Sequence, residues 1–231
     1  MFKKWVTAWA AAMICGSMAY GQKISKVDFD EVKKKVEDPQ SAWYYPALLK
    51  RYQNFDSTLR KADYHCLYYG HVFQKDYSPY GNDDNEAKCV EQFRTAKYEQ
   101  VIKFGEKALA QNPVNLKVLY RVIVSYDRLN NRYMANRYAR FYFPMIDCIM
   151  ASGDGKSKKT AYVVTDASDE YEVLNHLDLR SFRQQLDGDT DILTIDTTDQ
   201  RPMIGKEPIR EMYFNVSKPM QQLSQSMKGK E

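Results

Sequence analysis

Helical periodicity is clearest in the stretch YEQVIKFGEKALAQNPVNLKVLYRVIVSYDRL, residues 98–129. Apolar side chains recur there at three- and four-residue spacing, which is the pattern of an amphipathic helix. The Asn112-Pro113 pair interrupts the pattern, because a proline cannot continue a helix. The stretch therefore predicts two consecutive helices, over 98–111 and 116–129, joined by a short turn.

The same stretch resembles a tetratricopeptide repeat, in which two helices pack as a hairpin. The residues that match its motif are Tyr98, Ile102, Ala108, Leu109 and Pro113, followed by Leu119, Tyr126 and Ala135 in the next repeat. The segment 69–73 is similar to the first helix of an earlier repeat. Val101 and Gly105 depart from the pattern, because a repeat has a small residue at the first of these positions and a bulky one at the second. The resemblance implies a tetratricopeptide-like array of helical hairpins over residues 22–152.

Further helices are expected on both sides of this stretch. Asp28 and Glu31 form a capping pattern ahead of an apolar face, which predicts a helix over 28–37. We also expect helices over 46–54 and from Thr58 to Phe73, followed by an exposed loop over 74–87. After a turn at 130–131 the helical rhythm continues to Pro144. We expect the helix to end there, with one or two more turns over 145–150.

The chain changes character after Gly153. Short runs rich in branched and aromatic residues predict strands over 160–165, 191–197 and 210–217. Between the first two, Asp169 and Glu172 form a capping-box pattern that predicts a helix over 169–177. Helices followed by strands indicate an α+β fold, in which a small antiparallel sheet with one helix, residues 153–218, packs on the helical array. We expect residues 219–231 to form a flexible tail.

The N-terminus has the features of a secretory signal peptide over residues 1–21. Lys3 and Lys4 precede an apolar run from Trp5 to Ile14, and small residues follow before Gly21. One alternative is a membrane anchor, but the run is shorter than the roughly 20 residues that a membrane span needs. Another is a lipoprotein with a lipidated Cys15, for which the residue before the cysteine is unsuitable. We expect an exported, soluble mature chain, periplasmic or extracellular, with no transmembrane span.

The charge of the mature chain is nearly balanced. Without Lys3 and Lys4 it has 32 basic and 30 acidic residues, and the basic residues are scattered along the sequence. A protein that binds nucleic acid usually gathers its basic residues on one face. We therefore expect no nucleic-acid partner.

Three cysteines follow the signal peptide, namely Cys66, Cys89 and Cys148. Disulfides persist in exported proteins, and a bond between Cys66 and Cys89 would close a loop of about 23 residues and stabilise the fold by roughly 3 kcal/mol. The alternative, which we favour, is that all three are small buried apolar residues.

The sequence predicts no metal site and no cofactor. His65 and His71 are six residues apart, which places them on different faces of a helix. The acidic stretches 83–86 and 187–191 offer oxygen atoms to Ca²⁺, but neither completes a known loop, and we interpret both as solvated turns. The segment 153–157 is similar to the end of a phosphate-binding loop, but it lacks the first glycine of that motif, and we interpret it as a connecting loop.

Tyrosine is the most unusual component, with 18 residues in the chain. Tyr68 and Tyr69 lie in an expected helix, whereas Tyr77 and Tyr80 lie in the expected loop over 74–87. Tyrosine combines apolar bulk with a polar tip and therefore suits recognition surfaces. These four residues predict a binding site for a protein, peptide or glycan, and no residue is predicted to be catalytic.

Several segments taken together resemble one known family. They are Trp43-Tyr44-Tyr45-Pro46, 67–74 with the sequence LYYGHVFQ, Pro79-Tyr80, and 212–216 with the sequence MYFNV. The family is the exported bacterial proteins of domain of unknown function 4919, and the resemblance covers nearly the whole mature chain. It implies an envelope or extracellular location in a bacterium and carries over no catalytic residue. We therefore expect an exported noncatalytic binding or scaffold protein. The alternative is a secreted hydrolase with a carboxylate-based site.

Overall fold

The structure of the chain is a computed structural model that describes residues 26–80, 83–198 and 208–228. Most helices precede the sheet, as the predicted α+β class requires. They are α2 (Phe29–Glu37), α3 (Tyr45–Gln53), α4 (Lys61–Gly70), the 3-10 helix η1 (His71–Phe73), α5 (Asp84–Arg94), α6 (Tyr98–Gln111), α7 (Leu116–Arg128), α8 (Arg132–Ser152), η2 (Lys158–Thr160), α9 (Asp169–His176) and α10 (Ser217–Lys228). The strands are β1 (Tyr162–Val163), β2 (Ser181–Asp187), β3 (Thr190–Ile195) and β4 (Glu211–Asn215).

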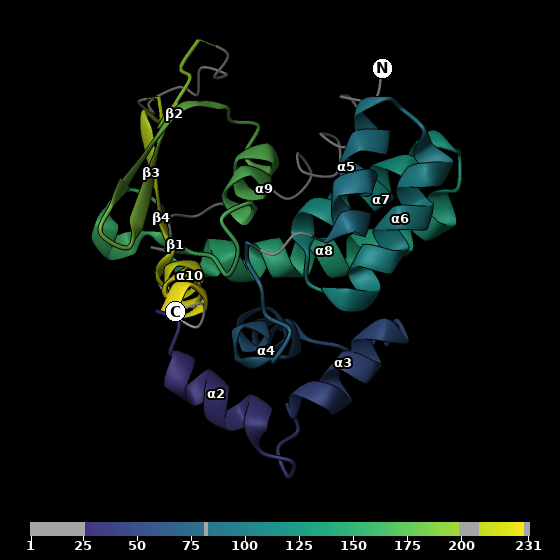
Figure 1. Ribbon diagram of the computed structural model, residues 1–231, viewed down its shortest axis with the longest axis horizontal. Helices are drawn as coiled ribbons and strands as arrows, with labels where there is room; N and C mark the ends of the chain where they lie inside the picture. The colour runs from purple at the N-terminus through teal and green to yellow at the C-terminus, as the bar shows by residue number, and fades with distance from the viewer. Residues whose placement is uncertain (1–25, 81–82, 199–207, 229–231) are drawn as a thin grey trace, which may run out of the picture.

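The helices form two groups around the long helix α8 (Figure 1). Helices α5, α6 and α7 lie together on one side, and α2, α3 and α4 lie below. The sheet stands on the other side, and α9 lies between the sheet and the α5–α7 group. Helix α9 contacts both α7 and α8, so its side chains lie where the helical part meets the sheet.

Local signals place several helix ends where the sequence predicts them. The Asp28 side chain accepts a hydrogen bond from the Glu31 backbone N–H at 2.9 Å and caps α2. Helix α6 has the predicted bounds, and Asn115 caps α7 by accepting from the Val118 N–H at 3.0 Å. Helix α3 has its proline in the first turn, where the missing N–H costs nothing.

The predicted end of a helix at Pro144 is wrong, because α8 continues through the proline to Ser152. A proline inside a helix leaves the carbonyl four residues earlier without its usual donor. That carbonyl belongs to Arg140, and the Tyr64 hydroxyl of α4 donates to it at 3.2 Å. A contact from a distant helix therefore supplies the hydrogen bond that Pro144 removes.

The sheet has the strand order β1-β4-β3-β2. Strands β2, β3 and β4 pair antiparallel, as predicted, whereas the two-residue β1 pairs parallel to β4. Strand β2 was not predicted, and its residues are exposed from Phe182 to Asp187. Residues 219–231 were expected to be a flexible tail, and the described part of that segment, 219–228, belongs to helix α10.

One continuous core joins the helices to the sheet. It includes Val36 of α2, Leu67 of α4, Ile146 of α8, Leu174 of α9 and Phe214 of β4, all of which are buried. The proposed boundary at residue 153 therefore does not interrupt the core, although the division into regions stays a prediction.

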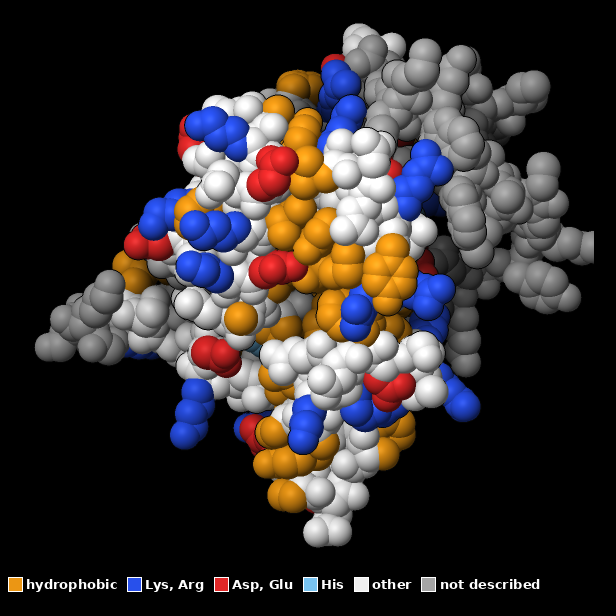
Figure 2. All heavy atoms as spheres, turned by 90° about the vertical axis from the view of Figure 1, so that its right-hand side faces the viewer, with side chains coloured by type: hydrophobic (Ala, Val, Ile, Leu, Met, Phe, Trp, Pro, Cys, Tyr) orange, Lys and Arg blue, Asp and Glu red, His pale blue; other side chains and the backbone are white. Residues whose placement is uncertain are grey.

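A smaller core lies between α5, α6 and α7, around Cys89, Val101 and Val122. Helices α6 and α7 are in close contact at Gly105, because a Cβ atom there would lie 2.4 Å from Val122 Cγ2. On the face shown in Figure 2, hydrophobic side chains form a band bordered by charged ones. The tetratricopeptide-like relation of these helices stays a prediction.

No helix within the described ranges is long and apolar enough to cross a membrane. The predicted signal peptide, residues 1–21, lies outside those ranges.

Candidate functional site

Helix α9 carries three buried acidic side chains in its first turn. Asp169 is 2% exposed, Glu170 0% and Glu172 4%. The predicted capping box is wrong, because the N-cap residue is Ser168 and its side chain makes no capping bond. The acidic residues lie instead in the interior, and burying a carboxylate there carries a considerable cost in free energy.

Two tyrosines of the helical part hold the segment that leads into α9. The Tyr68 hydroxyl donates to Asp169 Oδ2 at 2.6 Å and accepts from the Thr165 N–H at 3.2 Å. The Tyr77 hydroxyl donates to the Thr165 carbonyl at 2.7 Å. Tyr68 and Tyr77 are both buried, so these bonds fix the position of the Asp169 carboxyl group.

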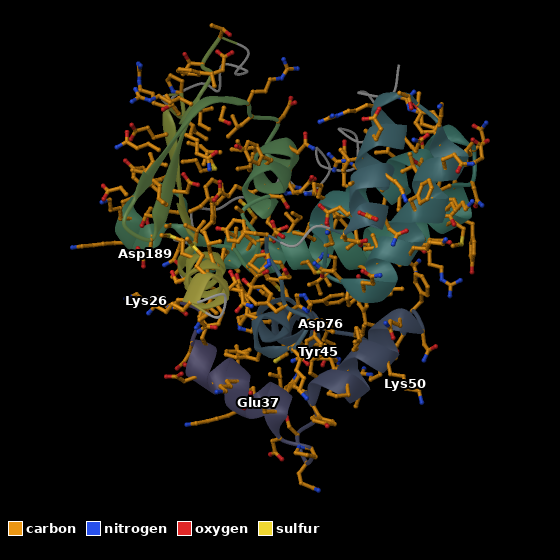
Figure 3. The ribbon with its side chains drawn as sticks, viewed as in Figure 1. Lys26, Glu37, Tyr45, Lys50, Asp76 and Asp189 are labelled. Atoms are coloured by element: carbon orange, nitrogen blue, oxygen red, sulfur yellow. The ribbon has the colours of Figure 1, made fainter. Side chains whose placement is uncertain are left out.

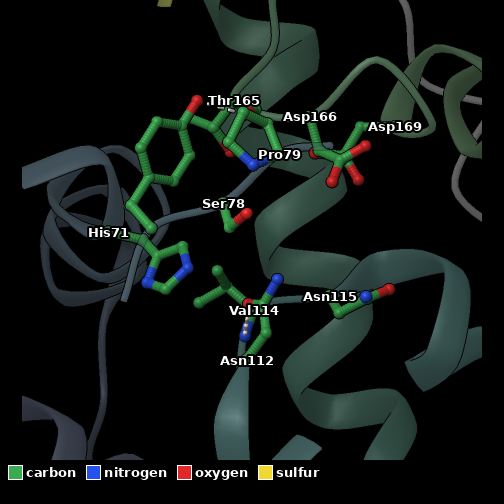
Figure 4. A pocket seen from close by; sticks show the side chains of 10 residues that line it. His71, Ser78, Pro79, Asn112, Val114, Asn115, Thr165, Asp166 and Asp169 are labelled. Atoms are coloured by element: carbon green, nitrogen blue, oxygen red, sulfur yellow. Dashed lines mark hydrogen bonds between the residues drawn. The ribbon is translucent and has the colours of Figure 1, made fainter. Parts of the chain in front are cut away.

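A small hollow lies beside this network (Figure 4). Three segments that are distant in sequence form its walls: the loop after η1, the turn between α6 and α7, and the start of α9. The lining residues are His71, Tyr77, Ser78, Pro79, Asn112, Val114, Asn115, Thr165, Asp166 and Asp169. The hollow is therefore polar on the side of α9 and partly apolar on the opposite side.

Glu170 differs from its neighbours because neither carboxyl oxygen has a hydrogen-bond partner. Asp191 of β3 is also buried, and its Oδ1 has no partner. The other oxygen of Asp191 accepts from the amide of Gln184, whose own oxygen accepts from the Tyr171 hydroxyl at 2.8 Å. This chain of contacts links α9 to β2 and β3 and leaves three buried carboxyl oxygens free.

Glu172, unlike Glu170, has partners on two neighbouring helices. Arg121 of α7 approaches its carboxylate at 3.5 Å, and the Tyr142 hydroxyl of α8 donates to it at 3.3 Å. Burial raises the pKa of Glu172, and the Arg121 charge opposes that rise. This pair ties α9 to the helices, and Glu172 is not part of the candidate site.

Burial dominates the electrostatics of the remaining acids. It raises the pKa of Glu170 to about 9, with further increases from the charges of Asp191 and Asp169. Burial also raises the pKa of Asp169 well above its usual range, and the charge of Asp166 adds to the rise. The pKa of Asp166 is raised by burial too. Glu170 therefore holds its proton at neutral pH and can act as a hydrogen-bond donor.

We define the acidic site as Asp166, Asp169, Glu170 and Asp191. Two tyrosines close to it in the chain or in charge interaction are half-exposed, Tyr80 at 47% and Tyr171 at 48%. Burial raises the pKa of both tyrosines, and the charges of Glu170 and Asp191 add to the rise. The carboxyl groups of the site can accept hydrogen bonds, and donate them where they are protonated.

The four predicted binding tyrosines have different positions. Tyr68 and Tyr77 support the acidic site from the interior, whereas Tyr80 is half-exposed. Tyr69 is fully buried in the core, where its hydroxyl donates to the carbonyls of Cys148 and Val163 at 3.3 and 3.2 Å. The structure brings Tyr68 and Tyr77 to one site, whereas Tyr69 packs elsewhere in the core. Their part in binding stays a prediction.

The residues that were weighed as metal ligands have other partners. His71 is buried, its Nδ1 lies 3.2 Å from the Tyr45 hydroxyl, and burial lowers its pKa to about 4. Tyr45 and Asp76 lie in the same area near α3 and α4 (Figure 3). The His65 ring packs against Tyr69 with 4.8 Å between the ring centroids. Within the described parts of the chain, no group of three or more His, Cys, Asp or Glu side chains could hold a metal ion.

The two acidic stretches likewise have structural roles. Asp83 caps α5, accepting from the Asn85 N–H at 2.8 Å, so this stretch begins a helix that was expected to be part of a loop. Glu86 pairs with Lys117 of α7. Asp187 pairs with Lys158 at the turn between β2 and β3, where Gly188 adopts a φ of 67°.

The three described cysteines are free and buried. Cys66 belongs to the main core and Cys89 to the smaller core, so the disulfide considered between them does not form. Burial raises the pKa of both thiols to about 11, which keeps them unreactive at neutral pH.

Sequence reasoning missed the acidic site itself. The pattern Asp-Glu-Tyr-Glu over 169–172 has the composition of an exposed first turn, where acidic residues favour the helix dipole. The available signal was that the apolar pair Val173 and Leu174 follows the acids directly, and that the apolar residues Tyr162 and Val164 precede them, so the acids lie between two buried segments.

No curated protein and no solved structure matches this chain. A family model described as "Domain of unknown function (DUF4919)" matches residues 30–225, which include every described residue of the acidic site and its tyrosines. The chain therefore belongs to the DUF4919 family of domains of unknown function.

Proposed function

We propose that this chain is an exported, noncatalytic binding protein of the bacterial envelope, and that the acidic site receives its ligand. One observation carries the proposal. Glu170 is fully buried, yet both of its carboxyl oxygens lack a hydrogen-bond partner, whereas Asp169 and Glu172 of the same helical turn have partners. A ligand that donates hydrogen bonds would satisfy these atoms, which otherwise destabilise the fold.

The surroundings of Glu170 support binding. Tyr68 and Tyr77 fix the neighbouring backbone and the Asp169 carboxyl group before any ligand arrives. A site whose groups are already positioned loses less conformational entropy on binding. Tyr80 and Tyr171 are half-exposed and offer aromatic surfaces that suit a peptide or a glycan.

The test is retention of the full chain on isolated bacterial envelope material. Tyr80→Ala removes a half-exposed aromatic ring, and Glu170→Gln removes the unpaired carboxyl group with little change in shape. We expect both to reduce retention. Glu37→Gln is the matched control, since Glu37 is exposed at the end of α2, away from α9 (Figure 3). Equal retention of all three variants and the parent chain would refute the proposed site.

A second candidate function is a secreted hydrolase with a carboxylate-based site. Two buried carboxyl groups favour it, namely Glu170, whose pKa is raised to about 9, and Asp191. Hydrolysis of glycosidic bonds uses one protonated acid and a second carboxylate. Turnover of a panel of chromogenic glycosides that Glu170→Gln and Asp191→Asn each abolish would favour this function over binding alone.

A further inference from the structure

We propose that two copies of this chain pair through strand β2, so that their sheets join edge to edge. The inference goes beyond the proposed function and does not depend on the acidic site. The second copy binds antiparallel, across a two-fold axis that passes beside Gln185 of both copies. The joined sheet then runs without a break from β1 of one copy to β1 of the other.

Strand β2 is an open edge of the sheet. It is last in the strand order, and among the described residues its pairing partner is β3 alone. Its residues are exposed from Phe182 to Asp187, and the apolar side chains of Phe182 and Leu186 are 72% and 54% exposed. Proteins usually protect such an edge from pairing with proline, lysine or a covering segment. Neither of these two residue types occurs in β2.

The outward backbone groups of β2 belong to Gln184 and Leu186. Successive residues of an antiparallel strand direct their N–H and C=O groups to opposite sides. In β3 the Ile195 N–H donates to the Arg210 carbonyl at 2.8 Å, on the side of β4, so the even-numbered residues of β3 bond to β2. Their partners in β2 have odd numbers. Gln184 and Leu186 therefore direct their backbone groups away from the sheet.

The register between the two copies follows from these outward groups. A bulge interrupts β2 at its start, so the regular edge runs from Arg183 to Asp187. A two-fold axis at the central residue, Gln185, places Gln184 of one copy opposite Leu186 of the second copy. The outward backbone groups of the two copies then meet and form hydrogen bonds. A shift by one residue would set outward groups against inward ones.

The same register is complementary in charge. It places Arg183 directly opposite Asp187 of the second copy, and the symmetry repeats this pair. The pair is one without backbone hydrogen bonds, in which side chains come closest. Asp187 also pairs with Lys158 of its own chain, and a carboxylate can accept from both cations because it has two oxygen atoms. These opposite charges favour a second copy over an arbitrary peptide.

Sedimentation velocity of the full chain at a series of concentrations tests the inference. We expect a species of twice the 27.0 kDa of the chain. Arg183→Glu sets acid against acid in both charged pairs, and Asp187→Lys sets base against base. Each variant should dimerise at least about tenfold more weakly than the parent chain, because like charges directly opposite each other are destabilising.

An equimolar mixture of the two variants gives the decisive measurement. In a mixed dimer the introduced glutamate faces the introduced lysine, and the unchanged Arg183 faces the unchanged Asp187. The mixture should therefore dimerise about as strongly as the parent chain, although neither variant does so alone. Since a misfolded variant could not recover in the mixture, this result also shows that both variants fold.

Arg94→Glu is the matched control. The Arg94 side chain is 74% exposed on α5, across the molecule from the sheet (Figure 1), and its replacement should leave dimerisation unchanged. A parent chain that stays monomeric at every concentration overturns the inference, whether or not the edge binds an extended peptide. Dimerisation that Arg183→Glu leaves unchanged overturns it too, as does a mixture that associates no better than either variant alone.

Discussion

Replacing Glu170 by glutamine should stabilise the protein, and the gain should increase with pH. In the folded chain, burial and the surrounding acids raise the pKa of Glu170 from 4.5 to about 9. The unfolded chain therefore loses its proton above pH 4.5, while the folded chain keeps it. Since the folded state binds more protons over this interval, its stability falls as pH rises from about 4.5 to about 9.

The size of the effect follows from the same pKa values. Each pH unit in the interval reduces the free energy of unfolding by about 1.4 kcal/mol. At pH 7 the reduction due to Glu170 amounts to about 3 kcal/mol, which is a large part of the 5 to 15 kcal/mol that stabilises a typical domain. Glutamine has nearly the same shape and does not titrate, so Glu170→Gln removes this cost.

Urea unfolding at pH 4.5, 6, 7 and 8 measures the difference between the two proteins. We expect equal stability at pH 4.5 and a gap in favour of Glu170→Gln that reaches about 3 kcal/mol at pH 7. The control Glu37→Gln should stay within about 0.5 kcal/mol of the parent chain at every pH, as is usual for surface substitutions. A variant less stable than the parent at pH 7, or a gap that does not change with pH, would refute the reasoning.

Two further predictions concern the helices. Tyr64→Phe should lower the free energy of unfolding by about 1 kcal/mol, because it removes the donor to the Arg140 carbonyl. The loss should be smaller in a Pro144→Ala background, where the helix regains its own N–H donor. A double-mutant cycle by urea unfolding measures this difference, and an equal loss in both backgrounds would contradict the prediction. Gly105→Ala should lower stability by about 1 to 3 kcal/mol, since the added Cβ would lie 2.4 Å from Val122 Cγ2; an unchanged denaturation midpoint would show that α6 and α7 can separate freely.

The helices could be predicted where their signals are local. The bounds of α6 follow from apolar spacing and from the Asn112-Pro113 turn, and Asp28 caps α2 as its position in the sequence indicates. Pro144 misled the prediction because its local effect is cancelled by Tyr64, which bonds to the Arg140 carbonyl from 76 residues earlier in the chain. No local pattern could reveal that contact.

Strand β2 was missed for a different reason. A strand is recognised in sequence by one buried face, and β2 has none, since Phe182 and Leu186 are 72% and 54% exposed. Its place is fixed by pairing with β3, with Gln184 opposite Leu193. Edge strands of this kind depend on a partner strand more than on their own composition.

Helix α9 was predicted at the correct place, but the role predicted for its acidic side chains was wrong. Asp169 and Glu172 have the spacing of a capping box, and α9 forms where that pattern predicts it. The bond that gives Asp169 its role comes from Tyr68, 101 residues earlier in the chain. Local spacing can therefore predict that a helix begins here, but only the fold determines which surface its acids face.

Glu170 lowers the free energy of unfolding at neutral pH, and this loss of stability is an argument that the residue has a function. Tyr68 and Tyr77 supply hydrogen bonds to the segment immediately before it, yet none reaches the Glu170 carboxyl group. An apolar residue or a glutamine at this position would avoid the loss of stability at neutral pH. Strained or unsatisfied groups gather at functional sites. A buried acid without a hydrogen-bond partner, next to acids that have one, is therefore the arrangement expected of a residue that binds a ligand.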